Sequence, residues 1–344
     1  MSYTTKALHI DKDTLQEFEK NSWTQDYLIK QMARPIAQDP KYLLLLKDNE
    51  FIVIDKQGSI KLRKALDYTP DGGAINNNGI VAIVSGAELH VYDINGDEIL
   101  SRTFTQTLHK FPRIGNNYLW VHTFTYPTTF YVYNLSDLSY TTFTLSLYRE
   151  WSLGFWCNEA GDEIIGGYGD TNNVIHLFIA DPSGIVKDVN TGAKGTTPGI
   201  YNRHDNAGAL IYREYDTLRQ IWLVNHDLDR VTVWSKDYGI IAAKVGAVID
   251  LNLMKGIIVS NQESVIYKYT FSLDTMTYEQ VDTLDLVDTP EQKDAYYGCG
   301  DMTPDGKYAV IPASNIKIID YDSLAVVKTI PKSFVNTPIR IIVA

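Results

Sequence analysis

Short apolar runs that end in Asp or Asn and lead into a tight turn recur along the whole chain. The first three are FIVID at 51–55, LHVYD at 89–93 and FYVYN at 130–134. The seven residues that begin these turns are Asp55, Asp93, Asn134, Asp181, Asn225, Asp274 and Asp320. They are spaced 38 to 49 residues apart, about 44 on average. Asp and Asn favour turns because their side chains accept hydrogen bonds from nearby backbone N–H groups. The pattern predicts a repeated unit with a turn at a fixed place.

Each repeated unit contains further strand-like segments around this turn. Apolar runs precede the turn-ending strands at 42–46, 79–84, 117–123, 162–168, 208–212, 255–260 and 307–311. An alternating segment such as VTVW (231–234) follows each turn, and this two-residue period predicts a strand. A fourth, Gly-rich inner strand is expected at segments such as 153–158, 198–203, 246–253 and 296–302. Four strands in about 44 residues are the blade of a β-propeller. The sequence therefore predicts an all-β, seven-bladed β-propeller.

The two ends of the chain differ from the repeats. Residues 1–34 contain two capping-box patterns and apolar residues at helical spacing, so we expect a short helical N-terminal extension. Pro35 and Pro40 end helical structure, and the propeller is expected to span 35–344. Residues 335–343 follow the last repeat, and we expect them to form a strand that joins the N-terminal blade and closes the ring.

One repeat is similar to a known family. Residues 302–330 read MTPDGKYAVIPASNIKIIDYDSLAVVKTI and resemble the repeat of YVTN-type and other WD40-like bacterial β-propellers. The shared features are a Pro-Asp-Gly turn, an apolar strand, a strand ending in Asp and a valine-rich outer strand. Weaker versions occur at 38–42 and 158–162. The WD dipeptide itself is absent at the strand-end Trp234, which Ser235 follows. The resemblance implies an architecture and carries no function with it.

Composition and charge narrow the function classes. The chain has 344 residues, with 23 Tyr and 11 Phe, and its net charge is -11. An acidic chain has no positive field to attract a phosphate backbone, so we expect no nucleic-acid partner. The apolar runs are shorter than the roughly 18 residues of a membrane span or the apolar core of a signal peptide. Together with only two cysteines, this favours a protein without a signal peptide or membrane insertion, located in the cytoplasm or in a virion.

Motifs for cofactors, metals and common hydrolases are absent from the sequence. There is no GxGxxG, GxxxxGK[ST], HExxH or GxSxG, and no two of the seven His lie within four residues of each other. We therefore expect no cofactor, no metal and no catalytic residue. Cys157 and Cys299 fall on inner strands three blades apart and are expected to line opposite parts of the channel, unpaired.

The candidate binding residues lie in loops at one face of the propeller. Tyr, Trp and Arg dominate binding hot spots because they bury much area with few rotamers lost. The candidates are Lys110, Tyr126, Tyr148, Arg149, Trp151 and Tyr215. The patch formed by Trp151 and Arg149 is the first choice, and the alternative is that Trp151 packs between blades.

These observations favour a non-catalytic protein-interaction or structural propeller with a protein partner on one face. The Asn-, Thr- and Tyr-rich strands favour a subunit of a larger assembly, such as a bacteriophage particle. Two alternatives stay open. One is a propeller enzyme of the lactonase or lyase type with an axial pocket. The other is a carbohydrate-binding propeller that stacks sugars on aromatic rings.

Overall fold

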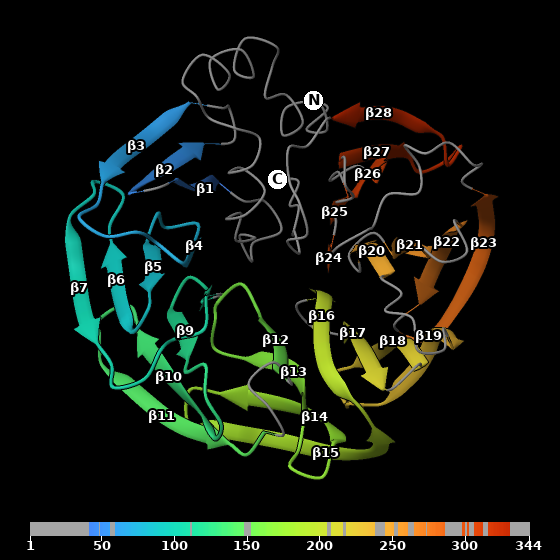
Figure 1. The fold of residues 1–344 in the computed structure, drawn as a ribbon, viewed down its shortest axis with the longest axis horizontal. Helices are drawn as coiled ribbons and strands as arrows, with labels where there is room; N and C mark the ends of the chain where they lie inside the picture. Colours follow the sequence, from blue (N-terminus) through green and yellow to red (C-terminus); the bar gives the residue numbers. More distant parts are fainter. Residues whose placement is uncertain are drawn as a thin grey trace.

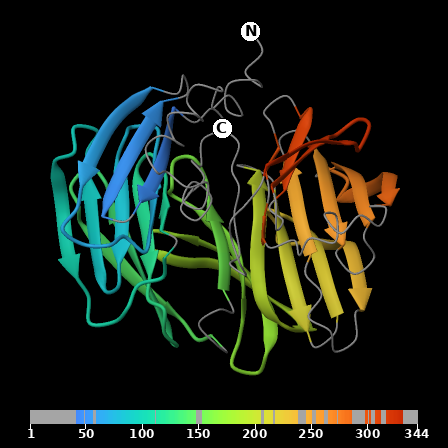
Figure 2. The same ribbon diagram turned by 45° about the horizontal axis from the view of Figure 1, so that its top comes forward.

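The strands of the protein form sheets arranged in a ring around a central axis (Figure 1). This computed structural model describes residues 41–330, with gaps at 48, 56–58, 111, 148–152, 205–207, 216–217, 238–244, 251–253, 261–264, 273, 286–297, 300, 303–305 and 312–315. In the tilted view of Figure 2, the sheets stand side by side around the axis. The described residues contain no helix with the length and hydrophobicity of a membrane span.

The strands described form seven sheets, each ordered from the axis to the rim except where noted below. The first three sheets are β1 (Tyr42–Lys47), β2 (Glu50–Asp55) and β3 (Ile60–Ala65); β4 (Gly72–Ile75), β5 (Val81–Ser85), β6 (Glu88–Tyr92) and β7 (Glu98–Thr103); and β8 (Arg113–Ile114), β9 (Tyr118–His122), β10 (Thr128–Asn134) and β11 (Tyr140–Leu145). The next two are β12 (Leu153–Cys157), β13 (Ile164–Gly169), β14 (Val174–Asp181) and β15 (Gly184–Lys194); and β16 (Thr196–His204), β17 (Gly208–Tyr215), β18 (Leu218–Asn225) and β19 (Arg230–Asp237). The last two are β20 (Val245–Asp250), β21 (Lys255–Ser260), β22 (Val265–Ser272), β23 (Thr277–Asp285) and β24 (Gly298–Cys299); and β25 (Asp301–Met302), β26 (Tyr308–Ile311), β27 (Ile316–Asp320) and β28 (Val326–Ile330).

This arrangement confirms the predicted all-β propeller. One predicted inner strand, 296–302, is divided: β24 pairs in parallel with β20 of the preceding sheet, and only β25 pairs with β26. The N-terminal helical extension and the closing strand at 335–343 lie outside the described residues. Within those residues the sheet of β1 has three strands, so the number of blades and the closure of the ring stay predictions.

Asx turns explain the repeated Asp and Asn residues. The Oδ1 atom of Asp93 accepts the backbone N–H groups of Asn95 and Asp97, both at 2.9 Å. Asn134 accepts the N–H of Ser136 in the same way at 2.9 Å. The backbone N–H of Asp97 and the amide groups of Asn95 hold the pKa of Asp93 below its usual range, since they stabilise the ionised carboxylate. The Asp and Asn residues recognised in the sequence therefore stabilise their turns by hydrogen bonds within a few residues, and this interaction recurs from sheet to sheet.

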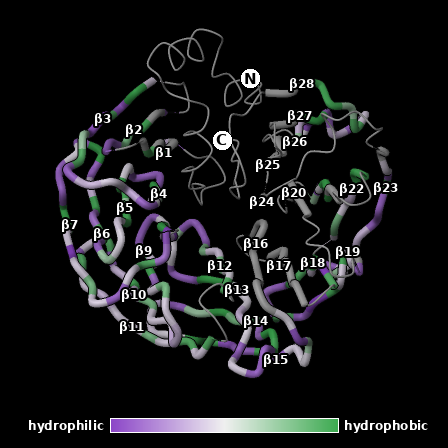
Figure 3. The backbone as a smooth tube through the Cα atoms, in the orientation of Figure 1, coloured by the Kyte–Doolittle hydropathy of each residue, from purple (hydrophilic) through white to green (hydrophobic). Residues whose placement is uncertain are grey.

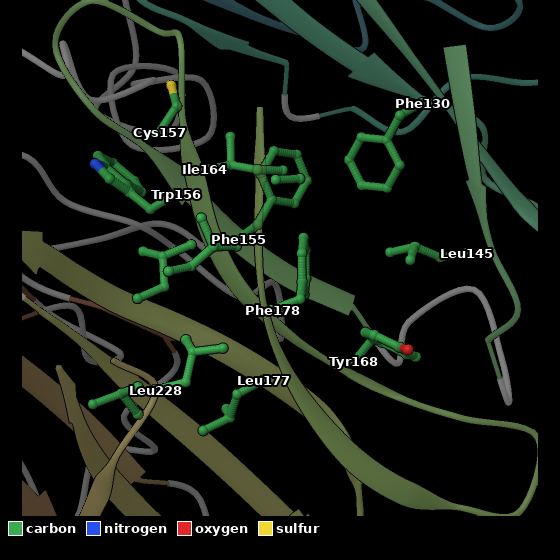
Figure 4. Close-up of a cluster of buried hydrophobic side chains, with 14 of the residues drawn as sticks. Phe130, Leu145, Phe155, Trp156, Cys157, Ile164, Tyr168, Leu177, Phe178 and Leu228 are labelled. Carbon is green, nitrogen blue, oxygen red and sulfur yellow. The ribbon is translucent and has the colours of Figure 1, made fainter. Parts of the chain in front are cut away.

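Burial between neighbouring sheets forms the core. Leu44 and Phe51 pack against Ile83 of the next sheet, and similar clusters join the following sheets as far as that of β16–β19. Figure 4 shows one such cluster, in which Phe130 and Leu145 lie beside residues of the next sheet, including Phe155. The hydropathy colouring in Figure 3 shows hydrophobic stretches in the middle strands of the described blades. Each sheet is thus covered on its faces by its neighbours.

The structure corrects the placement of Cys157. This residue lies on inner strand β12 as predicted, but its side chain is fully buried in the cluster between sheets and does not line the channel (Figure 4). Its thiol is free. The physical reason is that a strand alternates its side chains between two faces, and in a propeller both faces are covered by adjacent blades. The side chain of Cys299 lies outside the described residues.

Bulges mark the rim of the ring. The outer strand of each sheet pairs with the strand inside it, and six of the seven described pairs contain a register shift. Only the pair of β10 and β11 runs without one in this part of the chain. A bulge bends an edge strand and increases its twist, so it hinders pairing with another chain. The rim of this propeller is therefore protected almost everywhere.

Replacing Asn134 tests the turn chemistry. The Asn134→Ala variant removes the acceptor for the N–H and the hydroxyl of Ser136, at 2.9 and 2.8 Å. We expect the free energy of unfolding to fall by about 1 kcal/mol, because the turn loses two hydrogen bonds to this side chain. Chemical denaturation measures this change. The Asn134→Asp variant keeps the acceptor oxygen and is expected to keep most of the stability. Equal losses in both variants would argue against this role of the side chain.

Removing the C-terminal segment tests the predicted closure. Within the described residues β1 pairs only with β2, so its inner edge has no strand partner there. We expect a chain lacking residues 338–344 to aggregate or to melt without a cooperative transition, because the edge strands on either side of the closure become exposed. Size-exclusion chromatography and calorimetry measure both properties. A soluble truncated chain with a cooperative melting transition would contradict closure by this segment.

Candidate binding surface

Two of the six predicted binding residues are described with their side chains, and the same sheet carries both. Tyr126 lies in the loop between β9 and β10, and Lys110 lies just before β8. Tyr215 is the last residue of β17, but its side chain is outside the described residues. Tyr148, Arg149 and Trp151 lie outside the described residues altogether, so the patch of Trp151 and Arg149 stays a prediction. The candidate binding surface in the described residues is therefore formed by the loops at one end of the sheet β8–β11.

The loop between β9 and β10 is held by its own backbone and hydroxyl groups. Thr123 N donates to Thr129 O at 3.0 Å, which closes the base of the loop. The hydroxyl of Thr128 donates to Thr125 O at 2.5 Å across its interior. Phe124 N donates to Thr107 O at 2.8 Å and ties the loop to the segment that leads into β8. These bonds fix the loop before any partner binds, which lowers the entropic cost of binding.

Two aromatic side chains of this loop face solvent. Phe124 is 43% exposed and Tyr126 is 65% exposed. The other large apolar side chains that are exposed in the described residues all lie on outer strands: Ile60, Ile99, Tyr140, Ile185, Val186, Tyr278, Val281 and Val327. Single exposed apolar residues are ordinary on a protein surface, but two aromatic residues in one fixed loop form a small patch. We call Phe124 and Tyr126 the aromatic loop.

A column of stacked rings supports the aromatic loop from below. The ring of Phe124 lies 5.6 Å from that of His109, and the rings of His109 and His122 stack at 4.5 Å. His122 then stacks on Phe130 at 5.2 Å and meets Phe155 of the next sheet edge-on at 5.3 Å. The column connects the exposed loop to the buried core. The sequence alone does not reveal this column, because its members come from separate segments.

Burial keeps both imidazoles neutral. Burial, with smaller effects from the cations Arg113 and Lys110, lowers the pKa of His109 to about 4. Burial lowers the pKa of His122 well below its usual value, with a smaller effect from His109. The Nδ1 atom of His122 has no hydrogen-bond partner within the described residues. A neutral ring can tolerate this position, whereas a charged imidazolium there would lack compensation.

Ionic and cation-π contacts join this sheet to both neighbours. The Nζ of Lys110 lies 3.5 Å from Oδ1 of Asp71, in the segment before β4. Both side chains are exposed, so the pair adds little stability but leaves the surface beside the loop close to neutral. On the other side, the guanidinium of Arg113 lies 5.0 Å from the ring centre of Trp156 on β12.

Within the described residues, no three His, Cys, Asp or Glu side chains gather to hold a metal ion.

The buried histidines predict a stability that depends on pH. Their folded-state pKa values lie below the unfolded value of about 6.5, so the unfolded chain binds more protons as the pH falls. The contribution of these two histidines to the free energy of unfolding is fully present above pH 6.5 and decreases as the pH falls toward 4. For His109, with a pKa of about 4, the loss between pH 7 and pH 5 is about 2 kcal/mol.

Denaturation at pH 7 and pH 5 measures this loss. In the His122→Phe variant the ring column is kept and one proton-binding group is removed. The drop in unfolding free energy on acidification is expected to be smaller than in the wild type. An equal drop in both proteins would show that protonation of His122 does not cause the loss of stability at low pH.

Comparisons with known proteins identify the fold. No protein-family model matches the chain, and no curated protein matches it in sequence. The C-terminal WD40 domain of Sif2 matches with a TM-score of 0.61 and 8% identity, over 83% of this chain and 78% of that chain. KlAtg21, in complex with the coiled-coil of AgAtg16, matches with a TM-score of 0.60 and 10% identity, over 89% and 99% of the two chains.

An enzyme is also among the similar structures. Dihydro-heme d1 dehydrogenase NirN matches with a TM-score of 0.55 and 10% identity, over 88% of this chain and 66% of that chain. At such identities the likeness shows the fold and not the function, since propellers with one architecture serve many roles. The predicted resemblance to WD40-like propellers is confirmed at that level: this chain folds as a WD40-like β-propeller.

Proposed function

We propose that this protein is a non-catalytic β-propeller that binds a protein partner through the aromatic loop. The observation that carries the proposal is the exposure of Phe124 and Tyr126, 43% and 65%, in a loop whose backbone is already fixed by hydrogen bonds. Aromatic side chains on a fixed backbone bury a large area on binding and lose few rotamers. The ring column beneath Phe124 adds to this rigidity.

The surroundings of the aromatic loop favour a partner that is recognised by shape and apolar contact. Thr105, Gln106 and Thr107 beside it are exposed and uncharged, and Lys110 is paired with Asp71. Binding at such a surface should depend weakly on salt, because few charges are brought together. A protein partner is also what a similar structure, KlAtg21, holds in its complex with the coiled-coil of AgAtg16. Membership of a larger assembly, such as a virus particle, belongs to the same proposal and rests on composition alone.

A glycan is the second candidate ligand for this surface. Exposed aromatic rings beside Thr and Gln side chains offer a stacking face and hydrogen-bonding groups, which sugars also use. The enzyme alternative has less support: it rests on charged residues of the inner strands such as Arg113, Arg203, Asp250 and Asp301, each of which lies on a different sheet, whereas the exposed aromatic loop is directly described. We therefore place protein binding first.

A pair of matched double variants tests the proposal. Phe124→Ser with Tyr126→Ser removes the aromatic loop, and Ile99→Ser with Val327→Ser removes two exposed apolar side chains from outer strands β7 and β28. A photo-crosslinker placed at Thr125 identifies the partner in native material, and the purified partner is then titrated by calorimetry. We expect the loop variant to weaken binding at least tenfold, or about 1.4 kcal/mol. The rim variant is expected to bind like the wild type.

The outcomes separate the candidates. Equal affinity of the two double variants would place the partner elsewhere and overturn the assignment of the aromatic loop. Binding on a glycan array that disappears in the loop variant would replace the protein partner with a sugar. Esterase or lactonase turnover by the purified chain, lost in an Arg113→Ala variant, would contradict a non-catalytic role.

A further inference from the structure

Outer strands of this propeller carry two kinds of protection against pairing with another chain. The first is charge, because each of six outer strands contains at least one charged residue: Lys61 in β3, Glu98 in β7, Lys187 in β15, Arg230 in β19, Glu279 in β23 and Lys328 in β28. The second is the bulge that each of these six strands makes with the strand inside it. Both features are known to prevent edge-to-edge association of sheets.

Strand β11 has neither protection. Its sequence, YTTFTL, contains no charge and no proline, and consists of residues that favour strands. Its pairing with β10 is continuous from Tyr133↔Tyr140 to Thr128↔Leu145. It lies at the end of its sheet, on the rim in Figure 1, and no strand pairs with its outer edge within the described residues. Among the outer strands described, β11 alone is therefore a straight, neutral and open edge.

The register shows which backbone groups this edge offers. Asn134 N donates to Ser139 O at 2.8 Å, so this pair is hydrogen-bonded at the turn. Antiparallel pairs alternate between hydrogen-bonded and non-hydrogen-bonded types. The N–H and C=O groups of Tyr140, Thr142 and Thr144 therefore point away from β10, toward the open edge. These are six backbone groups in a regular row.

We propose that two copies of this chain associate through β11, with the two strands antiparallel and a two-fold axis at Thr142. In this arrangement Thr142 pairs with the same residue of the second copy, and Tyr140 pairs with Thr144. The outward N–H and C=O groups of these three residues then satisfy one another. Threonine pairs and tyrosine-threonine pairs are favourable neighbours across antiparallel strands. The interface is isologous, so it closes after two copies.

Charge favours a second copy at this edge over the edges of β3 and β23. Antiparallel self-pairing of β3 would bring together Lys61, Arg63 and Lys64, and self-pairing of β23 would bring together Glu279 and Asp282. Strand β11 itself contributes no charge to such a pair, and the guanidinium of Arg102 lies 4.0 Å from the ring centre of Tyr140 at the end of the strand. The two chains still repel as wholes, because each has a net charge of -11. Salt screens this repulsion, so the dimer should become stronger as the ionic strength rises.

Sedimentation velocity of the full chain tests the proposal. One strand pair makes a small interface, so we expect a reversible monomer-dimer equilibrium between about 1 and 200 µM. Thr142→Lys places two ammonium groups at the two-fold axis and should weaken association at least tenfold. Val281→Lys is the matched control, because Val281 is exposed on outer strand β23. This control should leave the dimer unchanged.

Each result decides for or against pairing through β11. A dimer that tightens with salt and weakens only in Thr142→Lys supports it. A wild-type chain that stays monomeric over this range, or a dimer that Thr142→Lys leaves intact, overturns it. If Thr142→Lys melts earlier than the wild type, Thr144→Lys, also exposed on β11, serves in its place. The aromatic loop is not part of this edge, so loss of Phe124 and Tyr126 should leave the dimer unchanged and keep this test separate from that of the proposed function.

Discussion

The packing of one sheet against the next is the constraint on which the rest of this structure depends. The inner strands converge near the axis, where little room is left for side chains. A Cβ atom at Gly72 would lie 1.7 Å from the carbonyl oxygen of Lys110, and one at Gly115 would lie 2.2 Å from Gly161 N. Trp120 uses the same junction, since its Nε1 donates to Gly161 O at 2.6 Å. Small residues at the axis therefore allow large ones to fill the space further out.

This packing also explains why the aromatic loop can be exposed and rigid at once. The loop lies on a column of rings that ends in the cluster between two sheets, with His122 between His109 and Phe130. Both histidines are neutral because burial disfavours their charged forms. A loop supported in this way can present Phe124 and Tyr126 without ordering them again on binding. The buried histidines also make this region sensitive to acid.

A ring of sheets shields the inner edges around the axis but leaves an open edge at the rim of each blade. The exposed apolar residues Ile99, Val186, Val281 and Val327 occur where the outer strands bulge, and charges accompany them. Such residues do not present a regular edge to another chain. Strand β11 departs from this rule while its fold is otherwise like that of its neighbours. The straight strand still contributes to the core, because Phe143 and Leu145 pack in the cluster beneath it.

The sequence by itself determined the repeat, the strands and their turns. Asp93 and Asn134 could be recognised because an Asx turn is made within five residues, and two-residue alternation is equally local. Residue type and loop position also identified Tyr126 and Lys110 as candidate binding residues. Only the tertiary structure brought Phe124, His109 and His122 into one column, because these residues come from separate segments and meet through packing. It also decided that Cys157 is buried and that β11 has no bulge. Register and burial depend on which strands become neighbours, and that information lies in the arrangement of the sheets and not in any single segment.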